Sequence, residues 1–247
     1  MDRFLYIAMN GAKNALHAQQ VNANNLANVS TVGFKAQLDH FKSQPVYGPG
    51  QATRAYASDE VSGADLSHGP VMTTGRELDV TINGDGWFAV QGDDGSIAYS
   101  RRGDFHTDPT GLLLNGENQI VLGEGGPITI PEFESLVIGR DGTISIRAAG
   151  QAANTLAAVD RLLLVNPPKE NLERGSDGLF RTKDGIDAAP DAAVSLTNGA
   201  LEASNVNTVD AMVNMIEYAR FYETQVKLMN VANENDASSA RLMRLSG

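Results

Sequence analysis

The four histidines, His17, His40, His68 and His106, are the side chains best suited to acid–base or metal chemistry near neutral pH. Their spacing matches neither the HExxH pattern of zinc hydrolases nor a closely spaced pair of metal-binding histidines. The chain contains no cysteine, so disulfides and thiolate metal sites are excluded. Because a lone histidine in a loop is most often solvated, this pattern predicts no metal site.

A calcium-binding loop is the next candidate. The stretch that begins at Asp79 has Asn83 and Gly84 at its fifth and sixth places, where such a loop has an oxygen ligand and a glycine. Its third place is Thr81, however, and its twelfth is Val90 instead of the bidentate glutamate. We therefore interpret this stretch as a turn.

Patterns of nucleophilic or phosphate chemistry are also missing. Glycine-rich residues 123–127 lack the Lys-Ser/Thr pair of a phosphate loop, and the sequence contains no GxSxG elbow. Asp93 and Asp94 are adjacent acids in a glycine-rich turn, where acids usually form the turn itself. We predict no catalytic residue, no cofactor and no small-molecule substrate. Since a site assembled from distant loops leaves no local signature, an enzyme or a ligand-binding β domain with helical ends stays open as the competing function.

The composition is that of a globular protein, with 247 residues, of which 42% are hydrophobic and 20% charged. The formal net charge of -11 argues against nucleic acid as a partner. The acidic excess lies in the middle of the chain, because the first 36 residues carry one acid and three bases, and the last 41 carry five acids and four bases. No apolar run is long enough to cross a bilayer, and the first residues lack the pattern of a cleaved secretory signal. We expect no direct membrane insertion.

Helical periodicity marks both ends. Residues 4–28 carry one stripe of apolar or small side chains, namely Leu5, Met9, Ala12, Leu16, Ala23 and Leu26. A second helix is predicted to start near Asn207 or Thr208, either of which can cap it. Its apolar positions are Val209, Met212, Val213, Ile216, Ala219, Val226 and Met229.

Between the helices the pattern is that of antiparallel strands. Residues 79–82 and 87–90 flank Asn-Gly-Asp-Gly and predict a hairpin, as do the strands around residues 93–96 and 139–142. The sequence therefore predicts an α+β fold with long N- and C-terminal helices packed as a coiled-coil-like pair and a central antiparallel β domain. We expect an N-terminal helical segment at residues 1–35, an extended connector at 36–75, the β domain at 76–204 and the C-terminal helix at 205–247.

Energetics suggest that the helices need further contacts. Ordering roughly 65 terminal residues costs on the order of 65–130 kcal/mol of backbone entropy. About a dozen buried apolar side chains return roughly 20–35 kcal/mol. The helices therefore need further buried apolar surface, which is supplied either by other chains or, in the simpler alternative, by the chain's own β domain.

Two segments resemble signatures of a known family. Residues 23–35, Ala-Asn-Asn-Leu-Ala-Asn-Val-Ser-Thr-Val-Gly-Phe-Lys, resemble the N-terminal signature of flagellar rod and hook proteins, and residues 199–206, Gly-Ala-Leu-Glu-Ala-Ser-Asn-Val, resemble their C-terminal one. Residues 79–105 are similar to the β domain that these proteins share. The positions that carry the resemblance are Asn24, Asn25, Leu26, Asn28, Gly33, Phe34, Ser204, Asn205, Val206, Arg220 and Glu223. Within the motif, Asn28 can end the helix in a left-handed conformation, and Gly33 permits a positive φ.

The resemblance implies a structural subunit of the bacterial flagellar basal-body rod, which assembles helically through its terminal helices to transmit torque. Implied partners are further copies, other rod proteins and the flagellar type III export apparatus, which removes no signal peptide. Residues 123–128 and 216–220 look more like those of a proximal-rod subunit, and a distal-rod or other axial subunit is the alternative. The apolar positions of the two helices are then our candidates for the assembly interface.

Overall fold

The structure is a computed structural model that describes residues 2–45, 55–60, 63–148 and 156–245. The chain divides into two compact units. A helical unit contains residues 1–28, 37–63 and 206–247, and a β unit contains residues 29–36 and 64–205. The prediction of an α+β fold with two terminal helices and a central antiparallel β region is confirmed.

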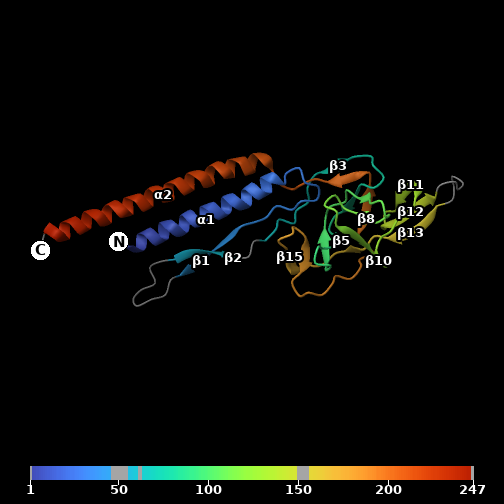
Figure 1. The fold of residues 1–247 in the computed structure, drawn as a ribbon, viewed down its shortest axis with the longest axis horizontal. Coiled ribbons are helices and arrows are strands. Elements are labelled where there is room, and N and C mark those ends of the chain that lie inside the picture. Colours follow the sequence, from blue (N-terminus) through green and yellow to red (C-terminus); the bar gives the residue numbers. More distant parts are fainter. Residues whose placement is uncertain (1, 46–54, 61–62, 149–155, 246–247) are drawn as a thin grey trace. The chain divides into compact units, whose positions relative to one another are not determined.

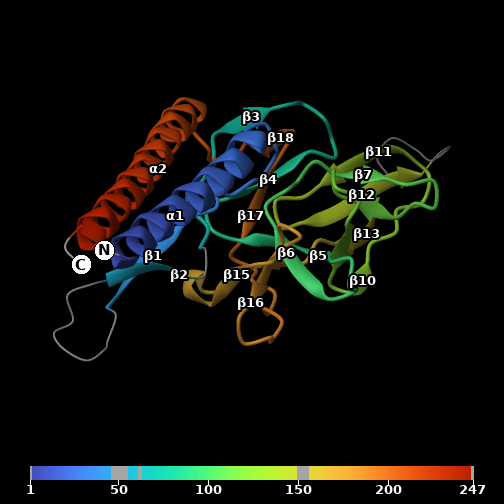
Figure 2. The same ribbon diagram turned by 60° about the vertical axis from the view of Figure 1, so that its left-hand side comes forward.

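The helical unit consists of α1 (Asp2–Ala27), α2 (Thr208–Leu245) and the antiparallel strand pair β1 (His40–Pro45) and β2 (Ala55–Glu60). This pair lies within the segment predicted as a connector, of which residues 46–54 and 61–62 fall outside the described part. Within this unit α1 lies between α2 and the strand pair (Figures 1 and 2). Both helices form where alanine is frequent and proline is absent.

Small local features set the helix ends. The side-chain oxygen of Asn207 accepts hydrogen bonds from the backbone N–H groups of Val209 at 3.0 Å and Asp210 at 3.4 Å, so the predicted cap is confirmed. At the end of α1, the side chain of Asn28 donates to the carbonyl of Asn24 at 2.9 Å. The prediction of a left-handed Asn28 is wrong, because among described non-glycine residues only Asn118 has a positive φ. The Asn28 side chain thus satisfies a carbonyl in the last turn of α1 without a left-handed backbone.

The β unit is built around a nine-stranded antiparallel sheet. Along its main path the order is β15-β16-β6-β5-β9-β8-β7, and β14 and β10 pair with β5 and β9. Its strands are β5 (Trp87–Gln91), β6 (Ile97–Ser100), β7 (His106–Thr107), β8 (Leu113–Leu114), β9 (Ile120–Gly123), β10 (Gly126–Pro127), β14 (Leu164–Val165), β15 (Leu172–Arg174) and β16 (Phe180–Thr182).

Three smaller sheets complete the unit. They are a three-stranded sheet and two strand pairs. These strands are β11 (Phe133–Ile138), β12 (Thr143–Ala148) and β13 (Ala157–Arg161); β4 (Val80–Asn83) with β17 (Ser195–Asn198); and β3 (Val71–Thr73) with β18 (Ala200–Glu202). The three-stranded sheet and the β4–β17 pair add buried apolar side chains to the same core cluster as the large sheet.

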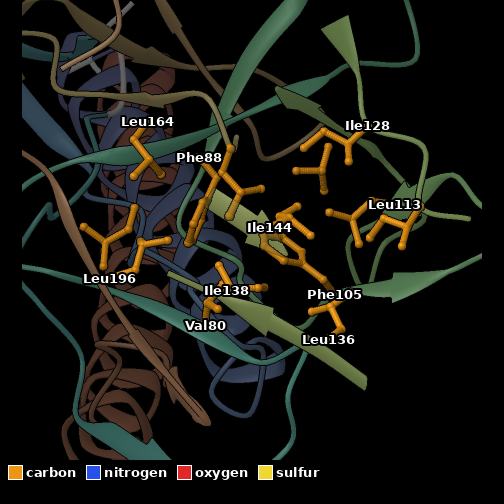
Figure 3. Packing of buried hydrophobic residues seen from close by; sticks show 14 of the residues in the cluster. Val80, Phe88, Phe105, Leu113, Ile128, Leu136, Ile138, Ile144, Leu164 and Leu196 are labelled. Carbon is orange, nitrogen blue, oxygen red and sulfur yellow. The ribbon is translucent and has the colours of Figure 1, made fainter. Parts of the chain in front are cut away.

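The core draws side chains from several of these sheets. Phe88 and Phe105 meet edge to face with ring centroids 5.2 Å apart, and aliphatic side chains surround them (Figure 3). Large fully buried side chains supply most of the apolar area removed from water, which stabilises the unit. The β unit therefore has its own hydrophobic core.

Two of the predicted hairpins are confirmed and one is wrong. β5 turns into β6, and β11 turns into β12, as expected. β4, however, pairs with β17 instead of with β5. The carbonyls of Gly84 and Gly86, in the predicted turn, accept hydrogen bonds from the Arg101 guanidinium at 2.9 and 2.7 Å, so the chain there binds a side chain and the two strands diverge.

Candidate assembly faces and a buried ionic cluster

Small residues are buried along α1, and Gly11 beside them faces α2. Ala8, Ala12 and Ala15 are buried on α1, and a Cβ at Gly11 would lie 2.9 Å from Cδ of Gln225 on α2. Near the other end, the Asn22 side chain donates to the carbonyl of Ala211 at 2.7 Å. The helices are therefore antiparallel, and at Gly11 there is no room for a side chain beside Gln225.

The other flank of α1 binds the segment that carries the strand pair. Asn25 mimics a backbone group, since its side chain accepts from the Gln37 N–H and donates to the Gln37 carbonyl, both at 2.8 Å. His17 Nδ1 lies 3.1 Å from a carboxylate oxygen of Asp39. Polar contacts thus hold this segment in place along α1.

Most of the predicted assembly residues lie outside these contacts. On α1, Met9 is 53% exposed and Leu16 49% exposed. On α2, Val209 is 68% and Ile216 56% exposed. Met212, Val213 and Ala23 are also exposed, Leu5, Leu26, Ala219, Val226 and Met229 are half-buried, and Ala12 is buried. Among the described residues of the two helices, four further large apolar side chains are exposed that lie off the predicted stripes, namely Tyr6, Ile7, Phe221 and Val231.

Several motif residues have structural partners in the β unit. Gly33 has a φ of +66°, as predicted, and its N–H donates to the Glu202 carbonyl at 2.7 Å. The Phe34 ring lies 4.7 Å below the guanidinium of Arg174, which also donates to the Lys35 carbonyl at 3.1 Å. Residues 29–36, which we call the strap, therefore dock on the β unit.

Asn205 holds the strap from the C-terminal side. Its side-chain oxygen accepts from the Ala36 N–H at 2.7 Å, and its amide group donates to the carbonyls of Asp65 at 2.8 Å and Ser67 at 3.2 Å. Ser204 beside it is buried. Of the other motif positions, Val206 is half-buried, and Asn24, Arg220 and Glu223 are exposed.

Three charged residues lie almost fully buried where the strap meets β18. Lys35, Arg101 and Glu202 form what we call the ionic cluster, with side chains 1%, 3% and 2% exposed. Lys35 Nζ donates to Glu202 Oε1 at 2.7 Å, and Arg101 donates to Glu202 Oε2 through Nε at 2.8 Å and Nη2 at 2.5 Å. These hydrogen bonds are charge-assisted, and two donors of the guanidinium share one carboxylate oxygen.

Burial and ion pairing both shift the pKa values of Lys35 and Glu202 in this cluster. Desolvation lowers the pKa of Lys35 below its ordinary value, against the attraction of Glu202. Desolvation alone would raise the pKa of Glu202, but Arg101 and Lys35 together hold it below its ordinary value. Both interactions keep the carboxylate ionised near neutral pH.

Partly exposed ionisable groups cover the cluster. His68 Nδ1 lies 3.1 Å from Arg101 Nη2, and His68 Nε2 lies 3.4 Å from Asp85. Lys169 Nζ lies 2.8 Å from the same Asp85 oxygen. Across the described residues, no set of three or more His, Asp or Glu side chains is arranged to hold a metal ion. The described helices also include none long and apolar enough to cross a membrane.

Sequence reasoning missed the ionic cluster as a unit. Its members come from the strap, from the chain after β6 and from β18, and Glu202 is separated from Arg101 by 101 positions and from Lys35 by 167. The available signal was their place inside the segments that resemble the family signatures, where a charged residue adjoins glycine and apolar positions.

Three family models match the chain. "Flagella basal body rod protein" matches residues 5–35, the D1 domain of "Flagellar hook protein FlgE/F/G" matches residues 81–146, and "Flagellar basal body rod FlgEFG protein C-terminal" matches residues 197–242. Three features described above fall within or next to these ranges: the strap, the β core and the start of α2.

Similar proteins cover the whole length. The chain is 41% identical to the flagellar basal-body rod protein FlgF of Salmonella typhimurium, with 100% of both chains aligned, and 41% identical to FlgF of Escherichia coli over the same share. It is 33% identical to the flagellar basal-body rod protein FlgG of Bacillus subtilis, over 95% of this chain and 96% of the relative. The chain therefore belongs to the family of flagellar basal-body rod proteins, and it resembles the FlgF members along its entire length.

Proposed function

We propose that this chain is a structural subunit of the proximal part of the flagellar rod, and that the exposed apolar faces of α1 and α2 bind neighbouring subunits. One observation carries the proposal. The buried apolar side chains of the two helices are mostly alanines, whereas large apolar side chains such as Met9, Leu16 and Ile216 remain exposed. Exposed apolar area of this kind marks an interaction surface.

Helical assembly requires heterologous contacts, in which one face of a subunit binds a different face of the next. Two helices with apolar side chains on more than one side provide such faces. The partners in this proposal are further copies, other rod proteins and the type III export apparatus, and export proceeds without a cleaved signal peptide. This role requires no catalysis.

A distal-rod subunit is the second candidate, because the FlgG relative from Bacillus subtilis is also similar over nearly the full chain. The 41% identity to two FlgF proteins favours the proximal rod. Immunogold labelling along isolated basal bodies distinguishes the two positions.

The assembly faces are tested by Ile216→Asp, which places a charge on an exposed apolar position of α2. We expect the β unit to keep its thermal transition while incorporation into rods, assayed by immunoblotting of purified basal bodies, falls below detection. Asn233→Asp adds the same charge at an exposed polar position of the same helix and is the matched control, with normal incorporation expected. Normal incorporation of the Ile216 variant would show that this face of α2 does not bind neighbouring subunits.

A further inference from the structure

The strap and the segment that begins with β18 contact each other along their backbones. Besides the bond between Gly33 and Glu202, the Asn205 N–H donates to the Phe34 carbonyl at 3.3 Å. Residues 65–70 join both, since the Asp65 N–H donates to the Ala36 carbonyl at 2.8 Å and the Ala203 N–H donates to the Pro70 carbonyl at 2.8 Å. Three segments far apart in sequence thus meet around the carboxylate of Glu202.

The charges in this cluster are unequal. Two cations, Lys35 and Arg101, share the single anion Glu202. If the strap leaves, Lys35 reaches water, and Arg101 and Glu202 remain as a balanced pair. If β18 leaves while the strap stays, two buried cations lose their counter-ion, which is strongly unfavourable in a low-dielectric environment.

β18 also has support that the strap lacks. It pairs with β3 through Ala200–Thr73, Leu201–Met72 and Glu202–Val71. Glu202 Oε1 additionally accepts the Gly69 N–H at 3.0 Å. β18 therefore retains backbone and side-chain partners when the strap is absent.

We propose that the ionic cluster imposes an order on the docking of the two connecting segments: β18 docks first, and the strap closes over it only while Glu202 is in place. The strap can open alone, but β18 can open only together with the strap. The cluster is thus a conformational device that makes the N-terminal connection of the β unit conditional on the C-terminal one.

Native-state hydrogen exchange of the full-length protein tests this order. The Gly33 and Ala36 amides report strap opening, and the Ala203 amide reports opening at β18. Lys35→Met removes the strap cation and leaves a balanced pair. Because β18 opens only together with the strap, the opening free energy at Ala203 includes that of the strap. We therefore expect Lys35→Met to accelerate exchange of the strap amides about tenfold or more and of Ala203 by a similar factor. An Ala203 exchange rate that stays unchanged while the strap amides accelerate would show that β18 opens independently of the strap and would overturn the proposed order.

The second variant, Glu202→Gln, leaves two buried cations without an anion, and we expect faster exchange at all three amides. Adding Lys35→Met to it removes one of these cations, so the double variant should exchange Ala203 more slowly than Glu202→Gln alone. If Glu202→Gln alone fails to fold, recovery of a folded protein in the double variant supports the same conclusion. A double variant no more stable than Glu202→Gln overturns the proposal.

The control is Lys169→Met. Lys169 is a cation near the cluster, 56% exposed and paired with Asp85 instead of Glu202. Exchange of all three amides is expected to stay within about threefold of the wild type, because an exposed ion pair contributes little. An acceleration as large as that of Lys35→Met would show that any nearby charge loss has this effect, and the specific role of the cluster would be rejected.

Discussion

Gly33 and Gly75 adopt the same left-handed conformation in different surroundings. Their φ angles are +66° and +74°. A Cβ at Gly33 would lie 2.5 Å from the backbone carbon of Arg101, whereas a Cβ at Gly75 would meet nothing within 4 Å. Gly33 therefore meets two requirements at once, a backbone conformation and a close approach of two chain segments.

This difference predicts the effect of two alanine substitutions. Gly75→Ala should lower the free energy of unfolding by about 1 kcal/mol, the usual cost of a left-handed alanine. Gly33→Ala carries the same strain and a backbone clash, so we expect a loss of about 3 kcal/mol or more. Urea denaturation followed by the fluorescence of the single tryptophan, Trp87, measures both. Equal losses would mean that the strap does not pack closely on Arg101.

At this scale, local chemistry was predictable from the sequence and distant chemistry was not. The cap at Asn207 and the positive φ of Gly33 follow from residue type and immediate neighbours. The contact of Glu202 with Arg101 spans 101 positions, and no periodic pattern in the sequence predicts it. A charged residue is expected at the surface by default, so the burial of all three cluster members depends on the tertiary fold alone.

The elements show the same division between local and distant pairing. The β5–β6 and β11–β12 hairpins were predicted because turn residues and flanking strands are adjacent in sequence. β4 carries a similar signal but pairs with β17, more than a hundred residues later. Helix periodicity likewise located α1 and α2 and gave one apolar stripe on each, but the buried apolar side chains of α1 are mostly alanines. Close packing of two helices selects small side chains, which a search for the most apolar stripe overlooks.

The pairing of β4 with β17 can be tested by a disulfide in this cysteine-free chain. Asn83 and Ser195 are directly opposed, and their side-chain atoms lie 3.4 Å apart. Asn83→Cys with Ser195→Cys should oxidise to an intrachain disulfide, seen as a loss of two hydrogens by mass spectrometry. Closing so long a loop should raise the free energy of unfolding by about 2–4 kcal/mol.

The single Asn83→Cys variant is the control for this experiment and should form only intermolecular disulfides. A double variant that also yields only dimers would contradict the register of β4 and β17.

At the scale of the whole molecule, the two units differ in what completes them. The β unit contains its own core, the ionic cluster and the strap, all within residues 29–36 and 64–205. The helical unit joins both chain ends and exposes large apolar side chains. The β unit is thus stabilised mainly by contacts within itself, whereas the proposed contacts with other subunits belong to the helical unit. The sequence indicated this division through its acidic, strand-rich middle, but not that residues 29–36 belong to the β unit.

Residues 29–205 should therefore fold without either helix. This fragment keeps Lys35, Arg101 and Glu202 together with every strand of the β unit. We expect cooperative thermal unfolding and near-ultraviolet circular dichroism that shows Trp87 in a fixed environment, as its 5% exposure in the full chain requires.

A shorter fragment, residues 37–205, loses the strap but keeps the Arg101–Glu202 pair. It should also fold, with a free energy of unfolding lower by about 1.5–3 kcal/mol, the range for hydrogen bonds to a charged group. If both fragments are equally stable, the strap contributes nothing to the β unit, and if neither folds, the helices are required for the core itself.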